Sequence, residues 1–227
     1  MTMRDSAGIS IVFSDDDIIV VSKPAGIPVH PSPGHETGTL VDWLLRRFPE
    51  MRGVGGPGHD GVVHRLDMDT SGVMVFARNA VSYKKLRMAF ERHDKVEKKY
   101  LAVVNGSPRE KTGTVDNFLF KMGSKMRVSP ESRGQRAVTH WEVLGRHGGR
   151  SLVEFRIETG RMHQIRVHAA CLGCPVVGDK IYGDREKDAR RHADALLLHA
   201  VELAFPHPKN GRRVVFAAQP PDEIIYF

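Results

Sequence analysis

A polar cluster enclosed by apolar residues constrains the fold of this chain more than any other feature. Residues 64–72 read His-Arg-Leu-Asp-Met-Asp-Thr-Ser-Gly; two valines precede them and the apolar run 73–76 follows. Such flanks are typical of strands that enter the core, with the polar residues at a turn or sheet end between them. A carboxylate such as Asp67 is costly there unless a cation or hydrogen bonds stabilise its charge. The pattern therefore predicts a dedicated partner or task for Asp67.

Local sequence leaves two interpretations of Asp67 open. In the structural one, Asp67 accepts hydrogen bonds from backbone amides or pairs with Arg65. In the functional one, it is a reactive group whose charge a distant cation maintains. Arg166 is a candidate cation, because its apolar neighbours Ile165 and Val167 favour a guanidinium at the rim of a pocket. The alternative for Arg166 is a solvent-exposed position.

Hydrophobic periodicity predicts an α+β fold for the 227 residues, which suffice for one sizeable core or two closely packed lobes. Alternating or short apolar runs bounded by turn residues indicate strands, and apolar residues at helical spacing indicate three helices. The expected fold is a mixed, largely antiparallel β-sheet with flanking helices. The expected strands cover 9–13, 18–21, 73–76, 100–104, 114–120, 137–144, 151–158, 195–205 and 213–218; the expected helices cover 39–48, 82–93 and 161–172.

The charge balance favours a polyanionic partner. The formal net charge is +7, from 34 Lys and Arg against 27 Asp and Glu, and the cations gather in segments 78–99 and 127–150. Nucleic acid is the expected partner, although the first segment also fits a solvated helix face. No apolar run approaches a membrane span, the first residues lack the apolar stretch of a secretory signal, and two cysteines make no disulfide framework. These features predict a cytoplasmic protein that does not bind membranes.

Several common chemistries are not supported by the sequence. Cys171 and Cys174 have a zinc-like spacing, but a second ligand pair is missing, so packing as small apolar residues is the better interpretation. The glycine-rich stretch 53–58 lacks the Gly-Lys-Ser/Thr ending of a phosphate-binding loop. No Gly-x-Ser-x-Gly nucleophile motif is present. We therefore expect no metal and no nucleotide hydrolysis.

Taken together, the motifs resemble the RluA-type family of RNA pseudouridine synthases, over nearly the whole chain. The resembling segments are a strand with a Lys-Pro-x-Gly turn, the His-Arg-Leu-Asp cluster with Thr-Ser-Gly, a tyrosine strand and a C-terminal block. They occur in the family's order at 17–26, 64–72, 98–102, 160–168, 173–183 and 198–208. Several long motifs in one order make chance agreement very unlikely.

The resemblance implies the pseudouridine synthase fold, with a central active-site cleft, and an isomerase acting on uridine in tRNA, rRNA or both. The family's reaction breaks the N1–C1′ glycosidic bond, turns the uracil and rejoins it through C5, without a cofactor or metal. Because uracil is both leaving group and returning nucleophile, one carboxylate can suffice where a glycosidase needs two. Whether that carboxylate adds to C1′ or abstracts the 2′ proton is left open by the sequence.

By the same resemblance, Asp67 is the catalytic carboxylate, Tyr100 packs against the target base, and Arg166 pairs with Asp67. Asp69 is interpreted as non-catalytic. The expected RNA- and uridine-binding residues are His64, Arg65, Thr70, Arg161, His163 and Gln164.

The chain is expected to be a single catalytic domain over 1–227, because the first predicted strand begins too early to leave room for the S4 RNA-binding domain of many relatives. It is also expected to be a monomer. A non-catalytic RNA-binding or RNA-folding chaperone of the same fold is the alternative, although intact Asp67, Tyr100 and Arg166 argue against it. A hydrolase would need a water-activating base that the sequence does not offer. The role of segment 184–194, read as an exposed loop or short helix, is not assigned.

Overall fold

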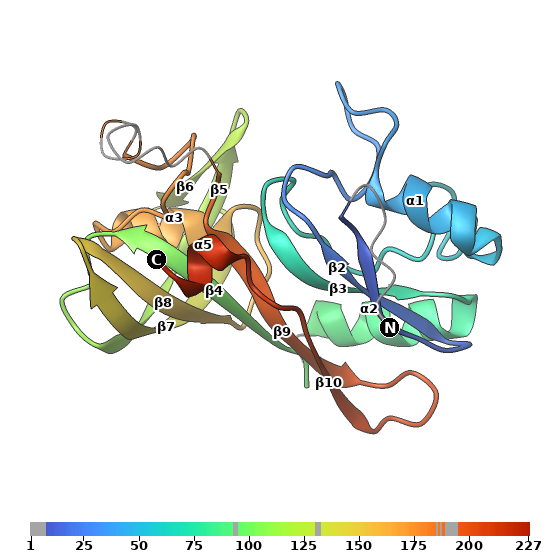
Figure 1. Ribbon diagram of the computed structural model, residues 1–227. Helices are drawn as coiled ribbons and strands as arrows, with labels where there is room; N and C mark the ends of the chain where they lie inside the picture. The colour runs from blue at the N-terminus through green and yellow to red at the C-terminus, as the bar shows by residue number, and fades with distance from the viewer. Residues whose placement is uncertain (1–7, 93–94, 130–132, 185, 187, 189–194) are drawn as a thin grey trace. The chain divides into compact units, whose positions relative to one another are not determined.

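The computed structural model describes residues 8–92, 95–129, 133–184, 186, 188 and 195–227 (Figure 1). Its contacts separate the chain into two compact units. The first unit consists of Met1–Glu97 with Ala200–Gln219, and the second of Lys98–His199 with Pro220–Phe227. The expectation of a single domain over 1–227 stays a prediction.

The first unit is built on strands in the order β1-β2-β3-β9-β10. Pairing is antiparallel between β1 and β2, between β2 and β3, and between β9 and β10. Its elements are β1 (Ser10–Ser14), β2 (Ile18–Lys23), α1 (Leu40–Arg47), the 3-10 helix η1 (Pro49–Met51), β3 (Ser71–Ala77), α2 (Ala80–Arg92), β9 (Leu198–Pro206, of which the part from Ala200 belongs to this unit) and β10 (Arg213–Ala217).

The core of the first unit lies where α2 covers β2 and β3. Leu86 and Phe90 are four residues apart on one face of α2, so both reach the sheet. They pack with Val20 and Val75, whose side chains alternate along their strands. All seven residues of β3 are buried, which explains why its sequence is almost entirely apolar. The polar cluster before β3 is therefore joined directly to a rigid core strand.

Local sequence fixes the start of α1. The Thr39 hydroxyl accepts from the backbone N–H of Asp42 (3.1 Å), and the Asp42 carboxylate accepts from the backbone N–H of Thr39 (3.0 Å). This reciprocal capping box satisfies two amides that the first helical turn leaves without partners. The predicted helix over 39–48 is confirmed, and the structure places its N-cap at Thr39.

Gly72 is required by close contact between two strands. Its φ is +125°, and a Cβ at this position would lie 2.3 Å from the carbonyl oxygen of Ala200 in β9. Any other side chain would force β3 and β9 apart or strain the backbone. The glycine that ends the His64–Gly72 motif therefore sets how β3 enters the sheet.

The second unit is an antiparallel sheet in the order β4-β8-β7-β5-β6. Helix α3 packs against β6 and β7, and the short helix α5 contributes Ile224 to a cluster with Val103 and Val177. The elements are β4 (Glu97–Asn105), β5 (Thr112–Met122), β6 (Lys125–Ser129), β7 (Gln135–His147), β8 (Arg150–Ile157), α3 (Gln164–Cys171) and α5 (Asp222–Ile225).

The predicted fold class is confirmed, with differences at particular elements. Strand β6 and helix α5 were not expected, because each is a short segment without a clear period. Helix α3 begins at Gln164, later than the expected start at 161, because His163 has a left-handed backbone (φ 54°) that no α-helix can continue through. Most of 184–194 lies outside the described residues. Asp188 is described there, buried and accepting hydrogen bonds from Asn105 Nδ2 and the Gly178 N–H.

Candidate active site

Asp67 lies at the start of a tight turn that leads into β3. The backbone N–H of Thr70 donates to the carbonyl of Asp67 (3.1 Å), and β3 begins at the next residue, Ser71. The Asp67 side chain is half-buried rather than fully enclosed. The predicted turn at a sheet end is therefore confirmed, with its carboxylate on a loop held by a core strand. A loop that is attached to a core strand suits a reactive group, because the strand limits how far the loop can move.

Lys23 fastens this turn to the Lys-Pro-Ala-Gly segment. Its side chain is fully buried, at 0% exposure, and its ammonium donates to the carbonyls of Pro24 (2.9 Å), Ile27 (2.8 Å) and Met68 (2.7 Å). The Gly26 N–H also donates to the Met68 carbonyl (2.9 Å). Met68 directly follows Asp67, so one buried lysine sets the backbone on which the carboxylate stands.

Burial lowers the pKa of Lys23 to about 8, while the charges of Asp69 and Asp67 act in the opposite direction and favour its protonated form. Removal of the ammonium from water disfavours its charge, and the three carbonyls and two carboxylates compensate in part. The charges of Lys23 and Asp67 therefore act on each other within the first unit.

We expect Lys23→Met to lower the free energy of unfolding by about 2–3 kcal/mol, because it leaves the part-buried Pro24 and Ile27 carbonyls without this donor and removes one of the two donors to Met68. Urea unfolding followed by circular dichroism measures the change. Lys84→Met, at an exposed position of α2, makes the same chemical change on the surface and should leave the midpoint within experimental error. Equal midpoints for Lys23→Met and wild type would show that the ammonium does not stabilise the loop.

Of the other predicted site residues in segment 64–72, two are packed into the fold and one is exposed. The Val75 N–H donates to His64 Nε2 (3.1 Å), so this nitrogen carries no proton, and the imidazole stacks on Phe90 with ring centroids 4.5 Å apart. Thr70 is buried at the end of the turn. Arg65 is exposed. Of the three predicted RNA contacts here, Arg65 alone presents an exposed side chain.

Tyr100 lies on β4 of the second unit, opposite Phe155 of β8, and is buried. Lys98 and Tyr100 are two residues apart on one strand, so their side chains leave the same face of the sheet. This placement agrees with the predicted tyrosine strand.

Arg166 has a buried carboxylate partner that the sequence interpretation did not foresee. Its Nε and one terminal nitrogen donate to the two oxygens of Asp179, each at 2.8 Å, and the Ile181 and Tyr182 N–H groups donate to Asp179 Oδ1. Burial alone would raise the pKa of Asp179, but Arg166 and the two amides together hold it below its usual value. The pairing of Arg166 with Asp67 stays a prediction.

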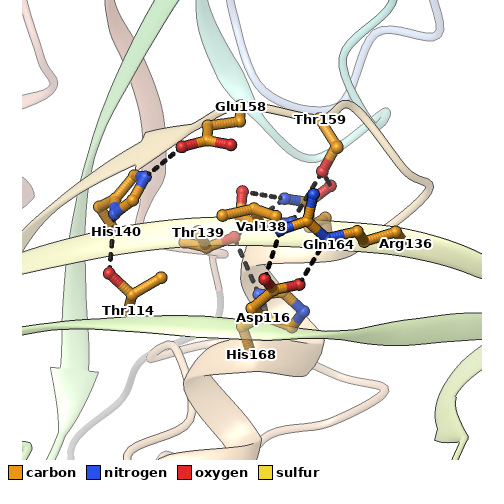
Figure 2. Close-up of polar contacts among 10 residues, drawn as sticks. All are labelled: Thr114, Asp116, Arg136, Val138, Thr139, His140, Glu158, Thr159, Gln164 and His168. Atoms are coloured by element: carbon orange, nitrogen blue, oxygen red, sulfur yellow. Dashed lines mark hydrogen bonds and ion pairs between the residues drawn. The ribbon is translucent and has the colours of Figure 1, made fainter.

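Gln164 is the centre of a buried network at the start of α3 (Figure 2). Its Oε1 accepts from Thr159 Oγ1 (2.8 Å) and the Arg161 N–H (3.0 Å), and its Nε2 donates to the Val138 carbonyl and to Thr139 Oγ1 (both 2.9 Å). These four bonds use the full hydrogen-bonding capacity of the amide. We therefore assign Gln164 to holding the loop at Arg161, in place of the predicted RNA contact.

His168 extends the same network as a neutral imidazole. It is fully buried, and desolvation lowers its pKa to about 4, although the charge of Asp116 opposes the shift. Its Nε2 donates to Asn117 Oδ1 (3.0 Å), so Nδ1 accepts from the Thr139 hydroxyl (2.8 Å). His168 is thus a structural histidine.

His163 caps α3 from a left-handed conformation and is tied to β6 through Tyr182. The Met126 N–H donates to the Tyr182 hydroxyl (2.8 Å), which lies 2.9 Å from His163 Nδ1. The tyrosine ring also lies 5.4 Å from the Arg166 guanidinium carbon. The predicted site residue His163 therefore shares a partner with Arg166.

A basic groove occupies one side of the first unit, between α2 and the turn that joins β9 to β10. Its volume is about 420 Å³, and Lys85 donates to the Pro208 carbonyl across it (2.6 Å). No carboxylate is among its described lining residues. The cations on its wall are Lys85, Arg92, Lys95 and Lys209. Three of these cations, Lys85, Arg92 and Lys95, belong to the predicted basic segment 78–99, so part of that segment lines one basic groove.

Within the described ranges, no group of three or more His, Cys, Asp or Glu residues could hold a metal ion. Cys171 is exposed and Cys174 buried, and both are free thiols. No helix among the described residues is long and apolar enough to cross a membrane.

Three residues with evident roles near these groups were not singled out from the sequence: Lys23, Lys98 and Asp179. All three lie within quoted motifs, so motif membership was the available signal. Burial of their charges was not readable, because lysine and aspartate are normally exposed.

The mostly antiparallel sheets with few helices define an α+β protein, and comparisons with known proteins identify its family. A sequence profile of RNA pseudouridylate synthase matches residues 17–171. An uncharacterized RNA pseudouridine synthase, YlyB of Bacillus subtilis, is 40% identical over 224 residues, covering 98% of this chain and 72% of the relative. A ribosomal large subunit pseudouridine synthase D of Zymomonas mobilis is 38% identical over 225 residues, covering 95% and 70%.

Solved structures give the same result. The structure of human RNA pseudouridylate synthase domain containing 1 has a TM-score of 0.74 at 25% identity, covering all of this chain and 96% of that one. The curated relatives are longer: this chain spans between 63% and 73% of their lengths. The chain belongs to the RNA pseudouridylate synthase family, a family of RNA-modifying isomerases.

Proposed function

We propose that this chain isomerises specific uridines in tRNA or rRNA to pseudouridine, with Asp67 as the catalytic carboxylate. The observation that supports this proposal best is the position of Asp67. Its half-buried carboxylate lies in the family's catalytic motif, on a turn that Lys23 holds through the Met68 carbonyl and that leads into β3. A single carboxylate on a fixed loop suits this reaction, because the departing uracil itself returns as the nucleophile.

The proposed reaction balances without an added reactant. The N1–C1′ bond breaks, uracil turns, and C5 forms the new bond to C1′; C5 then loses its proton and N1 gains one. The Asp67 carboxylate either adds to C1′ or removes the 2′ proton, and both routes need it ionised and aimed at the ribose. Water activation is not required, which distinguishes this chemistry from glycoside hydrolysis.

We propose supporting roles for three further residues. Tyr100 contacts the target base, and Arg166 supports the site with its guanidinium oriented by Asp179. Arg65, exposed beside Asp67, contacts RNA when the target uridine leaves its stack. The basic groove of the first unit supports an RNA partner, because a strip of cations without carboxylates favours a phosphate backbone.

The test is nucleotide-resolution mapping of pseudouridine in tRNA and rRNA transcribed in vitro, which contain none beforehand. After incubation with the purified chain, we expect pseudouridine at one or a few defined positions. RNA that is bound but remains unmodified would instead support a non-catalytic RNA-binding protein. Transcripts that are neither bound nor modified would overturn the proposal.

A further inference from the structure

Lys98 is a buried cation that has no counter-ion among the residues the structure describes. Its side chain is 7% exposed, in the first part of β4. None of the residues described in the structure accepts a hydrogen bond from its ammonium or pairs with it. Buried lysines of proteins are normally paired, because an isolated ammonium in an apolar surrounding is costly.

The surroundings of Lys98 are positive rather than negative. Desolvation, and then the charge of Arg161, lower the pKa of Lys98 to about 8, and no carboxylate of the described ranges opposes the shift. The two carboxylates in the neighbouring network are already engaged: Asp116 accepts from Arg136, and Glu158 accepts from His140 (Figure 2). Two cations without an anion between them form a site for an anionic ligand.

The backbone leaves room for such a ligand. Position 160 is glycine, and a Cβ there would lie 3.6 Å from the Lys98 ammonium, so a side chain would touch the amine. Arg161 follows directly. Gln164 accepts from the Arg161 N–H, and the Arg161 Nε donates to the Arg136 carbonyl (3.1 Å). The terminal nitrogens of Arg161 have no partner among the described residues, so they can donate to a phosphate.

We propose that Lys98 and Arg161 bind a backbone phosphate of the RNA, adjacent to the nucleotide that Tyr100 contacts. This inference rests on the proposed function, since it assigns the polyanion to the RNA substrate. Lys98 and Tyr100 leave β4 on the same face and are separated by roughly 7 Å along the strand, about the reach from a base to a neighbouring phosphate. The site lies wholly within the second unit.

The test compares wild type, Lys98→Met and Arg161→Met in binding a fluorescent twelve-residue oligouridylate at several salt concentrations. We expect each variant to bind roughly 3–10-fold more weakly in low salt and to reduce the slope of log K against log salt by about 0.7, the value for one lost contact on a single strand. Lys111→Met is the control: its side chain is 73% exposed and lies 3.9 Å from Glu142, so its slope should not change.

Two further measurements separate ligand binding from a structural role. Lys98→Met should melt at or above the wild-type temperature, because it removes an unpaired buried charge. Gly160→Ala keeps every charge and adds a methyl group in ordinary contact with the amine, so it should weaken binding without unfolding the protein. A lower melting temperature of Lys98→Met with an unchanged salt slope would overturn the inference.

The inference and the proposed function can fail separately. If wild type modifies transcripts but Lys98→Met retains the full salt slope, the phosphate site is wrong and the isomerase proposal stands. Absence of salt-dependent binding of the oligouridylate by wild type would also overturn the phosphate site.

Discussion

We expect the Asp67→Asn variant to lose at least about 10³-fold in the rate of pseudouridine formation, because the amide cannot add to C1′ or remove a proton. The substitution preserves the size of the side chain, and the turn is fixed by the backbone bond from Thr70 and by Lys23. Folding and RNA affinity should therefore remain close to wild type. Single-turnover measurement of pseudouridine in a mapped transcript gives the rate, and a binding titration gives the RNA affinity.

Asp69→Asn is the matched control for this experiment. Asp69 occupies the same turn, two residues from Asp67, and its charge also acts on Lys23. Because we interpret Asp69 as non-catalytic, its variant should retain the wild-type rate within about an order of magnitude. Full turnover by Asp67→Asn would remove Asp67 from the mechanism; a loss of turnover in Asp69→Asn as large as in Asp67→Asn would mean that the loop charge, and not one reactive carboxylate, is required.

The second large effect concerns Asp179. We expect Asp179→Asn to lower the free energy of unfolding by about 3–5 kcal/mol, because it removes the carboxylate charge that the buried Arg166 guanidinium contacts at two points. Arg166 is 5% exposed and Asp179 2% exposed, so solvent cannot replace the lost partner. Denaturant unfolding of the full chain measures the change. An unfolding midpoint equal to that of wild type would mean that this pair does not stabilise the fold.

A second Asp–Arg pair in the same unit provides the control. Asp116 and Arg136 form a similar two-point contact, but their side chains are 43% and 59% exposed. Asp116→Asn should leave the unfolding midpoint close to that of wild type, because water solvates both charges when the pair is broken. The contrast between the two variants tests whether burial, rather than the presence of a pair, sets the size of the effect.

The Asp179 contribution also has a defined pH dependence. Its pKa in the folded state lies below the usual 3.8, so the unfolded chain binds the proton more readily. The stability that the ion pair provides is therefore complete above about pH 4 and is lost as pH falls below that value. The difference in unfolding free energy between wild type and Asp179→Asn should shrink in the same range.

Local features of the sequence were sufficient for many elements. The helix at 40–47 follows from its capping residue Thr39 and an apolar face, and the helix at 80–92 from the spacing of Leu86 and Phe90. The motif around Asp67 predicted a turn at a sheet end, and the structure confirms it. Each of these depends on neighbours within about one helical turn or one strand, where side-chain period and capping determine conformation.

The partners of the charged groups could not be predicted in the same way. Lys23 reaches the Met68 carbonyl across 45 positions, and Gln164 engages Val138 across 26. Asp179 is only 13 positions from Arg166, but no periodic pattern connects a helix residue to a loop carboxylate at that distance. Gln164 was expected at the RNA surface and is instead part of the scaffold, because nothing in its own segment shows that the amide is buried.

The sequence by itself determined the class of fold, the family and the position of the Asp67 turn, because these are encoded in local periods and in motif order. Only the tertiary structure decided which charges are buried and what satisfies them: Lys23 by three carbonyls, Arg166 by Asp179, and Lys98 by no described residue. The physical reason is that burial depends on segments distant along the chain, and the cost of a buried charge is set by the partners that folding brings to it.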